Sequence, residues 1–206
     1  MIEKFLKPIG IVFHPLLMAT YSCILFYFLF PQVFSPIAFD TIPNFIGIVF
    51  LTTFIIPVIS ILFLKYTNRI TSLEMTHREE RVLPFISITA FYAITTYLFI
   101  TKIHVSDQLA AIMLVVTILV GLILLISIRY KISVHAAGIW GTFGIFSAFA
   151  MRYLTTSSII YLIILVLLAG IVCFSRLYLR KHTEDEVWAG AILGFILCFG
   201  GTYIFA

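Results

Sequence analysis

Long apolar segments separated by short polar links make up nearly the whole chain. A helix needs about 20 apolar residues to cross the hydrocarbon layer of a bilayer. By this measure the sequence predicts seven transmembrane helices, at residues 10–30, 44–64, 85–101, 108–128, 136–151, 157–174 and 187–205. Two of these segments, 85–101 and 136–151, are short for a full crossing and could be tilted or partly re-entrant, so six spans are the alternative to seven.

The composition points to the bilayer as the solvent. The chain is 62% hydrophobic and 11% charged, whereas soluble domains are roughly 45–50% apolar and about 25% charged. We therefore expect an all-α polytopic membrane helix bundle of six to seven transmembrane helices that forms a single domain over residues 1–206. The formal net charge of +4 does not predict nucleic-acid binding, because the basic residues are spread between apolar segments.

Basic residues gather on one side of this predicted bundle. With seven spans, only Lys102 and Arg152 fall on the side opposite the N-terminus. The basic residues on the N-terminal side are Lys4, Lys7, Lys65, Arg69, Arg78, Arg81, Arg129, Lys131, Arg176, Arg180 and Lys181. The positive-inside rule then predicts a cytoplasmic N-terminus.

Prolines and glycines inside the apolar segments predict local features of the helices. Pro15 and Pro57 each lie within an apolar segment and predict kinks. Gly190 and Gly194 have the small-xxx-small spacing that lets two helix backbones approach closely. We interpret this glycine pair as a packing feature.

The first polar cluster with candidate chemistry lies in the link before segment 85–101. Arg78 and Arg81 share a face there if the link is helical. A guanidinium is always charged, and its fork of donors matches phosphate oxygens. The alternative is a juxtamembrane anchor in which Glu79 and Glu80 balance the two arginines.

The second cluster precedes segment 136–151. Ser133 stands at the expected N-cap of this helix, and His135 stands in its first turn. The backbone N–H groups of a helix start favour anions, and Lys131 adds a cation nearby. Taken alone, Ser133 is an ordinary cap and His135 an interfacial residue.

The third cluster joins the last two predicted spans. Ser175 and Arg176 end one span, and His182 and Glu186 begin the next. A spacing of four residues would stack His182 and Glu186 on one helix face, so that the carboxylate accepts the imidazole N–H and fixes its tautomer. Thr183 and Glu186 also have the spacing of a capping box, which explains the glutamate as a helix-start residue. The two roles are compatible.

Taken in order, the three clusters resemble the signature motifs of the type 2 phosphatidic acid phosphatase (PAP2) superfamily, whose membrane members remove phosphate from lipid phosphates or pyrophosphates. The third motif carries most of the resemblance. Its pattern of Ser-Arg, five residues, His, three residues and Asp is matched by Ser175, Arg176 and His182, with Glu186 in place of the aspartate. The resemblance spans residues 78–194 and implies a PAP2-like bundle.

The other two motifs match in part. Ser133 and His135 keep the serine and histidine of the family's Pro-Ser-Gly-His, but the proline and glycine are replaced. Arg78, Arg81 and Pro84 resemble the first motif, which normally also has a lysine seven residues before an Arg-Pro pair. That lysine is absent from this chain.

The resemblance implies a mechanism without a metal or cofactor. His182 would be the nucleophile that forms a phosphohistidine, Glu186 would hold its ring, and His135 would protonate the leaving group and later activate water. The residues implied in phosphate binding are Arg176, Ser133, Arg78, Arg81 and Lys131.

The membrane setting and the resemblance together predict an amphiphilic substrate. Phosphatidate, phosphatidylglycerophosphate and polyprenyl pyrophosphate all fit, and we expect an integral multi-pass protein of a bacterial inner membrane. One alternative is a lipid phosphotransferase of the same fold, in which another hydroxyl intercepts the phosphohistidine. Another is a non-catalytic phospholipid-binding carrier that uses the basic pocket to hold a headgroup.

Overall fold

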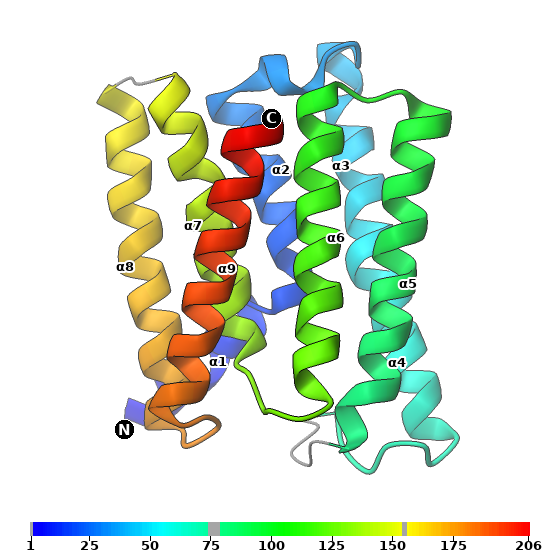
Figure 1. Cartoon of the computed structure of the whole chain (residues 1–206), viewed down its shortest axis with the longest axis vertical. Coiled ribbons are helices and arrows are strands. Elements are labelled where there is room, and N and C mark those ends of the chain that lie inside the picture. The colour runs from blue at the N-terminus through cyan, green and yellow to red at the C-terminus, as the bar shows by residue number, and fades with distance from the viewer. Residues whose placement is uncertain (1, 74–78, 154–155) are drawn as a thin grey trace. The chain divides into compact units, whose positions relative to one another are not determined.

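All regular structure in the described part of the chain is helical (Figure 1). The computed structural model describes residues 2–73, 79–153 and 156–206. Within them, six helices are long and apolar enough to cross a membrane. The bent pair Ile2–Val12 and Pro15–Leu29 would be a seventh if its two parts form one span. The chain is an all-helical, multi-pass membrane protein, as the sequence predicts.

The helices agree closely with the predicted apolar segments. The six long helices are Phe39–Tyr66, Glu79–Ile103, Asp107–Ser127, Val134–Arg152, Ser158–Tyr178 and Glu184–Phe205. Their α-helical parts, with the two N-terminal helices, are α1 (Ile2–Val12), α2 (Met18–Leu29), α3 (Ile42–Phe50), α4 (Ile56–Tyr66), α5 (Val82–Leu98), α6 (Asp107–Ser127), α7 (Val134–Arg152), α8 (Thr156–Tyr178) and α9 (Glu184–Phe205). The segment predicted at 136–151 extends by a few residues at its start and reaches spanning length.

Contacts along the chain form two compact units. The first unit comprises Met1–Met18 and Ile132–Ala206, and the second comprises Ala19–Lys131. The second and third polar clusters lie in the first unit, apart from Lys131.

The second unit contains α2 to α6. Helix α5 packs along α6, and α4 packs on α5. The hydroxyls of Thr96 and Thr117 lie 2.8 Å apart and join α5 to α6 within the apolar interior. Ser106 caps the start of α6, where its Oγ accepts from the Leu109 backbone N–H and donates to the carbonyl oxygen of Val33. These hydroxyls satisfy polar groups that would be costly to leave unpaired in a bilayer.

Both predicted proline kinks coincide with departures from the α-helix. The helix break before Pro15 leaves His14 extended, with φ −63° and ψ 134°, because a proline ring excludes the residue before it from the helical region. Pro57 is the second residue of α4 and follows a wide π-helical turn at Leu51–Ile55. The wide turn accommodates a ring that would clash with a carbonyl one α-helical turn earlier.

In the first unit, α7 packs most extensively on α9, and it also packs on α8. A Cβ added to Gly194 would lie 2.9 Å from the Cα and the carbonyl carbon of Ala137. A Cβ added to Gly190 would clash with the carbonyl oxygen of Ser133. The two glycines therefore place the second and third turns of α9 directly against the first turn of α7, and the predicted packing role is confirmed.

We expect Gly194→Ala to lower the free energy of unfolding by about 1–3 kcal/mol, because its methyl group has no space beside the Ala137 backbone. Gly200→Ala is the matched control on the same helix, since a Cβ there meets nothing within 4 Å. Thermal unfolding of the two variants in detergent would measure the difference. Equal stability of both variants would contradict the close approach of α7 and α9.

Candidate functional site

The start of α7 is joined to the start of α9 through Ser133. Ser133 is fully buried and caps α7, as predicted, with its Oγ accepting from the Ala136 backbone N–H at 3.4 Å. Its own backbone N–H donates to the carbonyl oxygen of Glu186 at 3.0 Å. The second and third clusters of the sequence therefore meet through a main-chain hydrogen bond, which fixes their spacing independently of side-chain rotamers.

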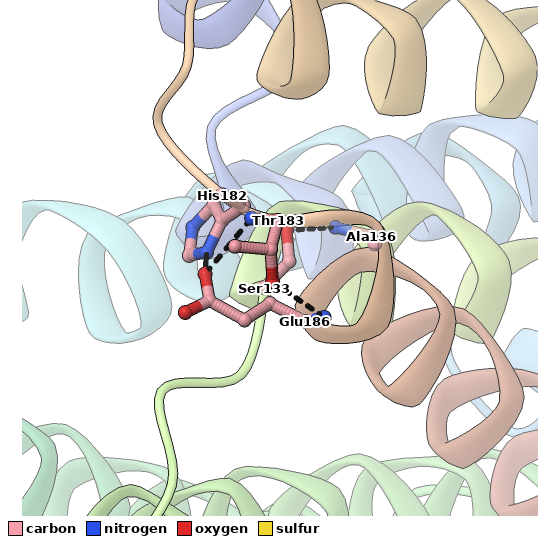
Figure 2. Close-up of polar contacts among 5 residues, drawn as sticks. All are labelled: Ser133, Ala136, His182, Thr183 and Glu186. Carbon is pink, nitrogen blue, oxygen red and sulfur yellow. Dashed lines mark hydrogen bonds and ion pairs between the residues drawn. The ribbon is translucent and has the colours of Figure 1, made fainter.

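The carboxylate of Glu186 holds the imidazole of His182. Figure 2 shows His182 and Thr183 directed toward this carboxylate, and Nδ1 of His182 lies 2.6 Å from Oε2. The same oxygen accepts from the Thr183 backbone N–H at 3.4 Å and so completes the predicted capping box. His182 precedes α9 instead of lying in its first turn, so it reaches Glu186 from outside the helix. One carboxylate therefore serves both predicted roles.

This contact determines which nitrogen of His182 is protonated and which one has a lone pair available for reaction. A carboxylate only accepts hydrogen bonds, so Nδ1 carries the proton. In the neutral ring the lone pair is then on Nε2. The side chain of His182 is only 7% exposed and that of Glu186 is 15% exposed, so the hydrogen bond between them is partly shielded from solvent and strengthened accordingly.

Arg176 lies at the end of α8 with its guanidinium in the interior of the first unit. It is 8% exposed. Its Nε donates to Oγ of Ser175 at 3.2 Å, and that hydroxyl donates in turn to the carbonyl oxygen of Val172. Ser175 therefore directs the guanidinium. This bond gives Ser175, the residue immediately before Arg176, a structural role in the cluster.

His135, in the first turn of α7, is held by the N-terminal helix. Its Nε2 lies 3.0 Å from the carbonyl oxygen of Gly10 in α1. A carbonyl only accepts, so Nε2 carries the proton and Nδ1 of the neutral ring is the acceptor. Arg176 and His182 both lie within electrostatic range of His135. The first unit thus gathers His135, Arg176, His182 and Glu186 into one polar cluster.

Gly10 and His14 of the N-terminal segment adjoin this cluster, and neither was among the predicted site residues. The rings of His14 and His135 meet edge to face, with their centroids 5.9 Å apart. The carbonyl of Gly10 bonds to His135, and the guanidinium of Arg176 lies so close to Gly10 that a Cβ added there would clash with it. One signal in the sequence marks His14: an ionisable residue inside an apolar segment is costly unless it has a partner or a function.

The remaining predicted phosphate-binding residues do not belong to the first unit. Arg78 lies outside the described residues. Arg81 is 6% exposed at the start of α5, and Lys131 follows α6; both belong to the second unit. Their role in phosphate binding stays a prediction. Glu80 accepts from the backbone N–H and the hydroxyl of Thr71, so it stabilises the local fold of that link.

Comparisons of this chain with family models, with curated proteins and with solved structures found no significant match. The geometry of the cluster is therefore the basis for its chemistry. It contains an oriented imidazole with a lone pair on Nε2, a buried guanidinium, a second imidazole, and the N–H groups at the start of α7. Such a set can bind an anion and transfer protons to it.

We expect the close contact between Gly10 and Arg176 to appear as a coupling between the two positions. A Cβ added to Gly10 would lie 2.6 Å from Nη1 of Arg176 and 2.7 Å from its Cζ. Gly10→Ala should therefore push the flexible end of Arg176 away from Ser175 and cost about 0.5–1.5 kcal/mol of stability in the wild-type background, the usual value of one lost hydrogen bond. In an Arg176→Ala background the same change should cost little, because the clashing group is gone.

Denaturant unfolding of the four proteins of this cycle, in detergent, measures the coupling. Gly170→Ala in α8 is the control, because a Cβ there meets nothing within 4 Å. If Gly10→Ala were as harmless as Gly170→Ala in the wild-type background, α1 would not cover Arg176 as described.

Proposed function

We propose that this protein is a membrane lipid phosphatase that hydrolyses a phosphomonoester or pyrophosphate of a lipid through a phosphohistidine on His182. The observation that carries the proposal is the 2.6 Å contact between His182 and Glu186, in a cluster that also holds Arg176 and His135. The substrate class includes phosphatidate, phosphatidylglycerophosphate and polyprenyl pyrophosphate. The partial resemblance of the three sequence clusters to the phosphatase motifs supports the same chemistry.

The protonation of His182 supports its role as nucleophile. With Nδ1–H bonded to Glu186, the lone pair on Nε2 attacks phosphorus, and the bond between phosphorus and the lipid oxygen breaks. The imidazole becomes positively charged in the phosphohistidine. The adjacent carboxylate stabilises that charge, and a water molecule then attacks phosphorus and breaks the P–N bond to release inorganic phosphate.

Arg176 and the start of α7 support the binding of the phosphoryl oxygens. A buried guanidinium has a stronger electrostatic effect than an exposed one, and Ser175 restricts its orientation. The free N–H groups in the first turn of a helix add neutral donors and a favourable dipole. Ser133 positions this turn because its backbone is bonded to Glu186.

His135 is the residue proposed to move protons. In the proposed cycle the ring enters the first step as the imidazolium, gives its Nδ1 proton to the leaving lipid oxygen, and as the neutral ring takes a proton from the attacking water in the second step. Because its Nε2 is bonded to the carbonyl of Gly10, the transfers run through Nδ1. This distribution of roles gives each imidazole one nitrogen held by the protein and one available for chemistry.

The place of the cluster along the helices supports a lipid substrate. The starts of α7 and α9 and the end of α8 lie at the same end of the first unit (Figure 1). These helices are candidate membrane spans, so their ends lie at the level of the lipid headgroups. A phosphorylated headgroup can reach such a site while its chains stay in the bilayer.

We expect His182→Ala to reduce phosphate release from the best lipid substrate by at least about a thousandfold, because the nucleophile is lost. The measurement is inorganic phosphate released from a panel of lipid phosphates and pyrophosphates by purified protein, with EDTA present. Release by His182→Ala at the wild-type rate would refute the phosphohistidine mechanism. Absence of release by the wild type, with transfer of phosphate to an added alcohol, would indicate a phosphotransferase.

We expect Glu186→Gln to lower kcat by about 10- to 100-fold while the fold stays intact. A glutamine at this position still completes a capping box with Thr183, but it carries no charge to stabilise the imidazolium. Glu184→Gln is the matched control, because Glu184 is an exposed carboxylate in the same first turn of α9. Equal kcat values for the two glutamine variants would contradict the role assigned to Glu186.

A further inference from the structure

The helix break in the N-terminal segment fixes the orientation of His14. Pro15 keeps His14 in an extended conformation, and His14 caps the short 3₁₀ turn Pro15–Leu17. Its Nδ1 accepts from the Leu16 backbone N–H at 3.3 Å. A backbone N–H only donates, so Nδ1 of His14 is unprotonated and Nε2 of the neutral ring carries the proton. His14 is therefore held as a hydrogen-bond donor.

His14 also lies beside the residues proposed to bind and protonate the phosphoryl group. Its ring meets that of His135 at an interplanar angle of 75°. Arg176 of α8 acts electrostatically on both His14 and His135. The groups that approach His14 from the packed helices are thus the guanidinium of Arg176 and the imidazole of His135. The guanidinium charge would attract an anion placed there, and the imidazole N–H of His14 would add a neutral donor.

From this arrangement we infer that His14 is a phosphate-binding residue, which donates from Nε2 to an oxygen of the phosphoryl group held by Arg176. The inference rests on the proposed function for the identity of the anion as a lipid phosphate. It assigns to the N-terminal segment a direct part in recognising the headgroup. The same segment fixes His135 through Gly10, so binding and proton transfer depend on one piece of chain.

A purely structural role for His14 is the alternative, and its cap position allows the two to be separated. Asparagine is a good N-cap residue, and its side-chain oxygen can accept from the Leu16 N–H. His14→Asn therefore keeps the cap and removes the imidazole donor. His14→Ala removes both. His104→Asn is a control for loss of a histidine elsewhere, because His104 is exposed with φ 55°, a conformation that asparagine tolerates.

The test measures binding of inorganic phosphate to the full-length protein in detergent, together with lipid-phosphate kinetics. Loss of a hydrogen bond to a charged group should weaken phosphate binding by His14→Asn about tenfold and raise KM for the lipid by a similar factor. Thermal unfolding should stay at the wild-type temperature in His14→Asn and fall in His14→Ala. His104→Asn should match the wild type in all of these measurements.

The outcomes distinguish this inference from the proposed function. Unchanged phosphate binding and KM in His14→Asn would show that His14 is only a cap, whether or not the wild type is a phosphatase. Phosphate binding that depends on His14, in a protein that releases no phosphate from lipids, would support the site and refute the phosphatase. A wild type that binds no phosphate would overturn the inference. If His14→Asn does not fold, His14→Ser tests the same point, since serine is also a good N-cap.

Discussion

The backbone hydrogen bond from Ser133 to Glu186 is the interaction on which the site depends. It exists because Gly190 and Gly194 let the second and third turns of α9 approach the first turn of α7 to backbone contact. In a bilayer the hydrophobic effect contributes little to the association of helices, so close van der Waals packing and hydrogen bonds between helices have to provide the stability. Here the same close contact that stabilises the helix pair also sets the distance between the capped start of α7 and the imidazole before α9.

Much of the first unit follows from patterns in the sequence. Apolar segment lengths predict the helices, the glycine spacing predicts a close helix contact without naming the partner helix, and the T-x-x-E spacing predicts the start of α9. Each of these patterns is local. Ser133 as a cap follows for the same reason. The pairing of His182 with Glu186 was also predicted from their spacing, but His182 precedes the cap of α9 and reaches the carboxylate from outside the helix.

The contribution of the N-terminal segment could not be predicted in the same way. Gly10 and His14 are more than a hundred residues from the clusters they join, and no periodicity links them to Arg176 or His135. The spacing of residues in the sequence also did not predict that Lys131 and Arg81 belong to a different compact unit from Arg176. That assignment follows from the contacts in the folded chain. Long-range packing determines both outcomes, and a single sequence carries no direct record of it.

The presence of a glutamate at position 186, where an aspartate would be one methylene shorter, has a physical consequence in this structure. Glu186 is the third residue of α9, and its side chain must reach back both to the Thr183 N–H and to Nδ1 of His182. Glutamate is the preferred carboxylate at this position of a capping box, because the additional methylene spans the distance to the cap backbone. An aspartate here would be shorter by that methylene and could not serve both donors from the same backbone position. One carboxylate therefore ties the start of α9 to the orientation of the imidazole, because the oxygen that completes the helix cap is also the oxygen that holds Nδ1 of His182.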